Sequence, residues 1–125
     1  MSGNQHILIV DDQIDNLIIL EDLLSDQYVI HTATNGEEAL VYLDSGGMAD
    51  LIVSDIRMPG LTGFELCERI KAISKWQSVP LVFLSGLITD EDRDFALSIG
   101  AAGFILKPFS LQTVLDEVSS YLGAA

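Results

Sequence analysis

The stretch His6-Ile7-Leu8-Ile9-Val10-Asp11-Asp12 decides the fold, because a short apolar run ends abruptly in two carboxylates. Runs of this kind, without polar alternation, are typical of strands buried on both faces of a parallel sheet. Three later runs also end in a polar residue: Leu51–Ser54 before Asp55, Leu81–Leu84 before Ser85, and Gly103–Leu106 before Lys107. In open α/β sheets the ligand lies outside the carboxyl ends of the strands. We therefore expect these polar side chains to share one edge of a sheet.

Helix-like segments alternate with the strand-like runs along the chain. Apolar residues recur at helical spacing at Ile14, Leu17, Ile18, Leu20, Leu23 and Leu24, and further helices are expected over Glu37–Leu43, Phe64–Ile73, Thr89 to about Gly100, and Ser110 to Leu122. Thr89 and Asp92 resemble a capping box with Asp in place of Glu. A remaining strand is expected over Tyr28–Ala33. The alternation predicts the α/β class, with a five-stranded parallel sheet and five helices on both faces.

Composition and charge exclude several classes of protein. The chain has 125 residues, which fits one domain over 1–125, and an apolar fraction of 49%, which argues against disorder. Its formal net charge of −13 makes direct nucleic-acid binding unexpected, since phosphate contacts need clusters of Lys and Arg. No apolar run is long enough to span a bilayer, and residues 1–5 lack a leader pattern, so a cytoplasmic location is expected. Cys67, the single cysteine, is expected to be a buried packing residue.

Asp11 and Asp12 are adjacent carboxylates that directly follow a strand. They repel each other unless a cation lies between them, and a hard divalent ion, Mg²⁺ or Mn²⁺, suits oxygen ligands. The pair alone fits a helix cap equally well. A third carboxylate, Asp55, favours the metal site, although Asp55 also fits a turn before Met58. As a nucleophile, Asp55 would accept a phosphoryl group and form an acyl phosphate next to the metal.

Ser85 and Lys107 complete the set of polar strand ends. The Ser85 hydroxyl can donate to a phosphoryl oxygen, although a serine before Gly86 also fits an ordinary turn. An ammonium group at Lys107 among three carboxylates has an electrostatic role, and the alternative is a surface lysine. Pro108 restricts the geometry of Lys107, because X-Pro bonds can be cis and the residue before proline is constrained.

Together these motifs resemble those of response-regulator receiver domains, the phosphoacceptor modules of two-component signalling. The matching residues are Val10-Asp11-Asp12, Asp55 with Met58-Pro59-Gly60, Ser85-Gly86 and Lys107-Pro108-Phe109. Each motif is weak alone, but the joint pattern is specific and covers nearly the whole chain. The resemblance implies a flavodoxin-like, doubly wound fold with strand order 2-1-3-4-5.

The resemblance also implies a role for each matching residue. Asp55 would be the phosphorylated aspartate, in a protein that catalyses its own phosphorylation and dephosphorylation but is not a stand-alone enzyme. Mg²⁺ would be bound by Asp11, Asp12 and Asp55 together with the backbone carbonyl of Arg57. Ser85 and Lys107 would contact the phosphoryl group. The phosphodonor would be a histidine kinase, a histidine phosphotransfer protein or a small donor such as acetyl phosphate.

Output in this family depends on the hydroxyl at the Ser85 position and an aromatic ring at the Phe104 position. Phe104 lacks the hydroxyl of the tyrosine often found there, so a switch would work by packing alone, and a plain core role is the alternative. The implied output surface spans roughly Thr89–Ile99 and Gly103–Tyr121. It would face an effector domain, a partner protein or a second copy of the chain in a homodimer. Two departures, Arg57 and Leu87, are expected to change the rate of dephosphorylation in a direction that the sequence does not give.

Other functions fit the sequence less well. A flavodoxin needs a hydroxyl- and glycine-rich phosphate loop where Asp11-Asp12 stand, and a dinucleotide-binding domain needs a Gly-x-Gly-x-x-Gly motif that is absent. A haloacid-dehalogenase-like phosphatase also uses an aspartate nucleophile, but Arg57 occupies the position of its general acid. A pseudo-receiver that acts as an interaction module without phosphorylation is the remaining alternative. The chain is expected to be either a complete single-domain regulator or a receiver from a longer protein, and Met1 favours the N-terminal end of the natural chain without deciding between them.

Overall fold

The computed structural model describes residues 5–86 and 88–123, and its centre is one five-stranded parallel sheet. The strands are β1 (His6–Val10), β2 (Val29–Ala33), β3 (Leu51–Asp55), β4 (Leu81–Ser85) and β5 (Gly103–Leu106). Their order in space is β2-β1-β3-β4-β5, with every neighbouring pair parallel. This is the flavodoxin-like strand order expected for the α/β fold.

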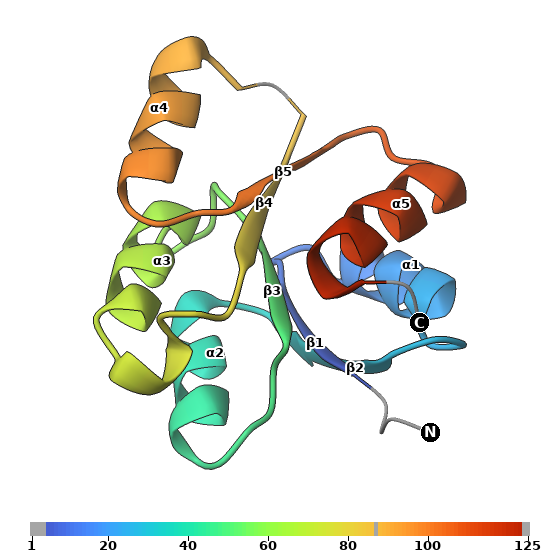
Figure 1. The fold of residues 1–125 in the computed structure, drawn as a ribbon, viewed down its shortest axis with the longest axis horizontal. Helices are drawn as coiled ribbons and strands as arrows, with labels where there is room; N and C mark the ends of the chain where they lie inside the picture. The colour runs from blue at the N-terminus through green and yellow to red at the C-terminus, as the bar shows by residue number, and fades with distance from the viewer. Residues whose placement is uncertain (1–4, 87, 124–125) are drawn as a thin grey trace.

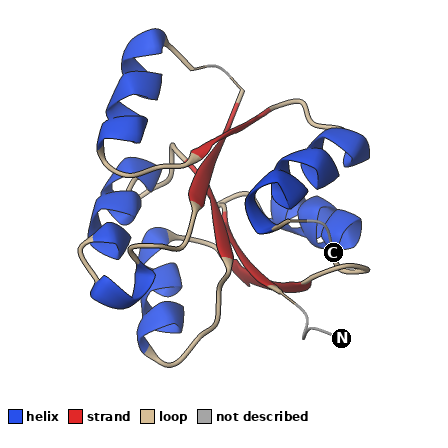
Figure 2. Ribbon diagram, viewed as in Figure 1, coloured by secondary structure: helices blue, strands red, loops and turns tan. Residues whose placement is uncertain are grey.

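Helices cover both faces of the sheet (Figures 1 and 2). They are α1 (Ile14–Leu24), α2 (Gly36–Asp44), α3 (Gly63–Lys71), α4 (Asp90–Ser98) and α5 (Leu111–Leu122), with a 3₁₀ turn η1 (Ser74–Trp76) before β4. Helices α1 and α5 lie on one face, and α2, α3 and α4 lie on the other (Figure 1). No helix within the described part of the chain is both long enough and apolar enough to cross a membrane.

Two apolar layers result, because successive strand residues point to opposite faces of the sheet. In β1, Ile7 and Ile9 pack under α1 and α5, whereas Leu8 and Val10 pack under α2 and α3. All four of these side chains are fully buried. Burial on both faces explains why the strands are continuous apolar runs, as the sequence predicts.

The helix ends are fixed by local hydrogen bonds. The Thr89 hydroxyl accepts from the backbone N–H of Asp92 at 3.0 Å, which confirms the expected N-cap of α4. A complete capping box occurs at α3 instead: Thr62 Oγ1 accepts from Glu65 N at 3.2 Å, and Glu65 Oε1 accepts from Thr62 N at 3.0 Å. That box fixes the start of α3 next to the carboxyl end of β3.

The expected elements are confirmed to within one or two residues, and the differences are informative. The helix expected to reach Ile73 ends at Lys71, and Ile73 is 42% exposed in the turn that leads to η1. The apolar stripe of α1 is wider than its buried face, since Ile14 and Ile18 are 60% and 54% exposed. Buried Trp76 packs against the core, and Cys67 is buried as expected.

Candidate functional site

The carboxyl edge of the sheet brings together the polar residues that the sequence places at strand ends. Asp11 and Asp12 follow β1, Asp55 is the last residue of β3, and Ser85 is the last residue of β4. Lys107 follows β5, where its backbone N–H donates to the Ser85 carbonyl at 2.8 Å. The parallel register therefore places the ends of four strands side by side.

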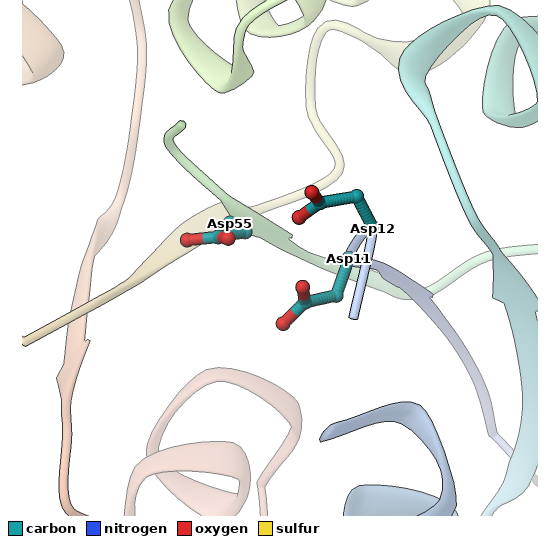
Figure 3. A group of neighbouring side chains, drawn as sticks. All are labelled: Asp11, Asp12 and Asp55. Atoms are coloured by element: carbon teal, nitrogen blue, oxygen red, sulfur yellow. The ribbon is translucent and has the colours of Figure 1, made fainter. Parts of the chain in front are cut away.

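Three carboxylates form a compact cluster at this edge. One oxygen from each of Asp11, Asp12 and Asp55 lies within 4.8 Å of the others, around a common space (Figure 3). Asp11 is fully buried, Asp12 is exposed and Asp55 is half-buried. A cluster of hard oxygen donors with one solvent-exposed side fits Mg²⁺, which binds through a few carboxylates and keeps several waters.

Asp55 is the carboxylate with a cationic neighbour. Lys107 Nζ lies 3.6 Å from Asp55 Oδ1, which also accepts a hydrogen bond from the backbone N–H of Ile56 at 2.9 Å. Burial and the negative charge of Asp11 nevertheless raise the pKa of Asp55, against the opposing effect of Lys107. The carboxylate is therefore held in a site that disfavours its charge unless a further cation is present.

A cleft of about 480 Å³ opens in front of Asp55. Its lining residues are Asp12, Gln13, Asp55, Ile56, Arg57, Ser85, Gly86, Thr89, Asp92 and Lys107. The cleft thus combines carboxylates, hydroxyls and an ammonium group, and it has room for a small anionic group in front of the nucleophile candidate. Fully buried Asp11 does not line it.

Gly63 sets the position of the Asp55 backbone. A Cβ atom at residue 63 would collide with the carbonyl oxygen of Asp55 and lie 2.9 Å from Cα of Ile56. The Gly63 N–H also donates to the Ile56 carbonyl at 2.7 Å. The start of α3 therefore packs directly on the end of β3, and only glycine fits this approach.

Sequence reasoning missed the residues that hold Asp11. Asp11 Oδ1 accepts from the backbone N–H of Gln13 at 2.9 Å, and Asp11 Oδ2 accepts from Asn16 Nδ2 at 3.0 Å. The available signal was the position of Asn16 in the first turn of the helix that follows the aspartate pair. Its significance depends on a side-chain contact that spacing alone does not specify.

Phe104 lies on β5, away from the lining of the cleft. Its ring is half-buried, 6.1 Å from the ring of Phe83, and the guanidinium carbon of Arg93 lies 5.1 Å from its centroid. Sequence reasoning also missed this cation–π contact, which joins α4 to β5. The Lys107–Pro108 bond is cis, and Leu87 lies outside the described residues.

Comparison with known proteins identifies the family of the chain. The family model described as the response regulator receiver domain matches residues 7–119. A probable cyclic di-GMP phosphodiesterase from Vibrio cholerae is 34% identical over 116 residues, which make up 93% of this chain and 26% of that protein. The chain also spans only about half the length of several similar transcriptional regulators.

Solved structures show the same architecture. Chemotaxis protein CheY4 of Vibrio cholerae has a TM-score of 0.91 at 30% identity, with 95% of this chain and 99% of that chain covered. A co-crystal structure of the Saccharomyces cerevisiae histidine phosphotransfer protein Ypd1 and the receiver domain of its response regulator Ssk1 matches with a TM-score of 0.83 at 26% identity, covering 97% of this chain and 90% of that chain. With the family match over nine-tenths of its length, the chain belongs to the response regulator receiver domains of two-component signalling.

Proposed function

We propose that this receiver domain accepts a phosphoryl group on Asp55 in a Mg²⁺-dependent reaction. The observation that carries the proposal is the position of Asp55 between negatively charged carboxylates on one side and a positively charged ammonium group on the other. It has two carboxylates within 4.8 Å on the metal side and the Lys107 ammonium 3.6 Å from its Oδ1. A carboxylate nucleophile that receives a dianionic group needs cations beside it, which Lys107 and a divalent ion held by the two other carboxylates would supply.

The donor set supports a divalent cation at this place. Asp11, Asp12 and Asp55 would hold the ion, and the backbone carbonyl of Arg57 would add a further oxygen. When bound, Mg²⁺ neutralises phosphoryl oxygens and offsets the charge that builds up during attack. Mn²⁺ has the same preference for oxygen ligands and would serve as a spectroscopic substitute.

The remaining residues have roles that follow from charge and position. In the transfer, an Asp55 oxygen forms a bond to phosphorus while the phosphorus–nitrogen bond of a phosphohistidine breaks. The imidazole leaves with the bonding electron pair and takes up a proton from solvent. Lys107 stabilises the negative charge of the transferred group, and the Ser85 hydroxyl, at the end of the neighbouring strand, donates to one of its oxygens.

The switch would connect Ser85 with Phe104. Phosphorylation would draw the Ser85 hydroxyl toward the phosphoryl group, and the Phe104 ring would move into the space released beside Phe83. The surface of α4, β5 and α5 would then change its packing toward an effector domain, a partner protein or a second copy of the chain. Phosphorylation biases this equilibrium only if the two arrangements interact with the phosphoryl group differently.

We infer that the chain acts as a single domain over residues 1–125, at a cytoplasmic location, without stand-alone enzymatic activity. A histidine kinase or histidine phosphotransfer protein would supply the phosphoryl group, and acetyl phosphate would substitute for it in vitro. The complex of Ypd1 with the Ssk1 receiver domain supports a partner of this kind. The net charge of −13 argues against direct nucleic-acid contact.

The test is incubation with acetyl phosphate and Mg²⁺, followed by intact mass measurement. We expect one phosphoryl adduct on the wild type, and none on Asp55→Asn or in a sample with EDTA. Beryllofluoride, which mimics the phosphoryl group without being hydrolysed, separates rapid hydrolysis from a failure to react. A wild-type protein that neither forms the adduct nor binds beryllofluoride would be a pseudo-receiver, and the proposal would be wrong.

A further inference from the structure

We propose that Asn16 is a positioning residue that fixes the Asp11 carboxylate in the orientation needed to bind the divalent cation. The inference rests on the proposed function, because it assigns a role within the proposed metal site. Asn16 lies in the first turn of α1, and it is half-buried next to Asp11.

The two oxygens of Asp11 are held by two different donors. The Gln13 backbone N–H donates to Oδ1 at 2.9 Å, and Asn16 Nδ2 donates to Oδ2 at 3.0 Å. Rotation of an aspartate carboxylate about χ2 is otherwise broad, with no single staggered minimum. One donor on each oxygen therefore defines the plane of the group. Each oxygen keeps acceptor capacity for a further partner.

The Asn16 amide is itself held in one orientation. Its Nδ2 also donates to Gln13 Oε1 at 3.2 Å, so both amide hydrogens have acceptors. The flipped amide would direct an oxygen at the Asp11 carboxylate and at the Gln13 oxygen, and neither can donate. The backbone N–H of Asn16 donates to the Gln13 carbonyl at 3.1 Å, which fixes the main chain as well.

A neutral donor is suited to this position. A lysine or arginine next to Asp11 would neutralise the carboxylate and repel the incoming cation. An amide satisfies one lone pair of the buried oxygen while leaving the charge of Asp11 available. The carboxylates therefore have different neighbours: the ammonium group of Lys107 lies beside Asp55, and the amide of Asn16 lies beside Asp11.

The test is a titration with Mn²⁺, in which electron paramagnetic resonance reports the free ion. Hydrogen-bond partners of metal ligands contribute about 10- to 100-fold to metal affinity. Asn16→Leu, which keeps the branch at Cγ but has no amide donors, should therefore raise the Mn²⁺ Kd by about tenfold or more. Asn16→Gln retains an amide and should recover part of the loss.

Gln112→Leu is the matched control. It also removes an amide-to-carboxylate hydrogen bond, from Gln112 Nε2 to Asp116 Oδ1 at 2.8 Å, but on α5 outside the cleft lining. Its Mn²⁺ Kd should equal that of the wild type. Thermal unfolding in EDTA checks that each variant is folded.

The outcomes separate the inference from the proposal on which it rests. If the wild type shows no saturable Mn²⁺ binding, the metal site itself is wrong. If the wild type binds and Asn16→Leu binds equally well, the role of Asn16 is wrong while the proposed function stands. Should Asn16→Leu fail to fold, Asn16→Ala decides, because it removes the same donor to Asp11 without adding an apolar branch and should weaken Mn²⁺ binding; an unchanged Kd overturns the inference.

Discussion

Replacement of Asp55 by asparagine should stabilise the metal-free protein, although it removes the proposed phosphorylation site. The carboxylate is half-buried, within 4.8 Å of two other carboxylates, and its pKa is raised by burial and by Asp11. Its charge is opposed by one cation, Lys107, at 3.6 Å. Asparagine has nearly the same shape and can still accept from the Ile56 N–H, so the substitution changes mainly the charge.

The magnitude follows from these separations. At an effective dielectric constant of about 20, two like charges at the upper limit of 4.8 Å repel by about 3.5 kcal/mol, and opposite charges 3.6 Å apart attract by about 4.6 kcal/mol. Two repulsions then exceed one attraction by about 2 kcal/mol, and full screening by water reduces this excess to about 0.6 kcal/mol. We expect a gain of about 1–2 kcal/mol, or roughly 4–8 °C in Tm for a domain of this size.

The assay is urea and thermal unfolding of both proteins in EDTA at neutral pH and low salt. Asp22→Asn, an exposed substitution on α1, is the control for the loss of one negative charge and should change the free energy of unfolding far less. Saturating Mg²⁺ should stabilise the wild type more than Asp55→Asn and so reduce the difference in free energy of unfolding between the two proteins. A metal-free Asp55→Asn protein that is no more stable than the wild type would refute the electrostatic reasoning.

Three further predictions concern pH, backbone packing and the cysteine. Because folding raises the pKa of Asp55, the free energy of unfolding of the metal-free wild type should fall as pH rises from about 4 through that raised pKa. The extra stability of Asp55→Asn, measured by urea unfolding, should therefore be small at pH 4 and reach its full value by pH 7. Gly63→Ala should destabilise the protein by about 1–3 kcal/mol and weaken Mn²⁺ binding, because the added Cβ displaces the end of β3. If neither the free energy of unfolding nor the Mn²⁺ Kd changes, this packing argument is wrong. Burial raises the pKa of the Cys67 thiol to about 11, so iodoacetamide at pH 8 should label Cys67 slowly in the native protein and quickly in guanidinium chloride, as mass spectrometry would report.

The sheet and the site edge were predictable because both follow from patterns along the chain. Strands buried on both faces must be apolar throughout, and this requirement gave the positions of β1, β3, β4 and β5. Parallel connection then brings the carboxyl ends together whatever the details of packing. The proximity of Asp11, Asp12, Asp55 and Lys107 is thus a consequence of topology, and the structure confirms it.

Features that depend on contacts between elements were not predictable. The apolar stripe of a helix does not show which of its residues the rest of the protein covers, so the exposure of Ile14 and Ile18 was missed. The contact of Arg93 with Phe104 depends on how closely α4 approaches β5. The hydrogen bond from Asn16 to Asp11 depends on a side-chain rotamer in the first turn of α1. Each involves a side-chain geometry that residue spacing does not determine.

The three clustered carboxylates are not chemically equivalent, because they differ in burial and in the charge of their neighbours. Asp11 is fully buried and satisfied by neutral donors, so its charge remains available to a cation. Asp12 is exposed and lines the cleft, where a metal with bound water would reach it. Asp55 alone is paired, in the described part of the chain, with an ammonium group that can stabilise additional negative charge. Under the proposed function, Asp55 needs that cation because it must carry the added charge of a phosphoryl group, whereas Asp11 serves only as a metal ligand and attracts a cation more strongly without one.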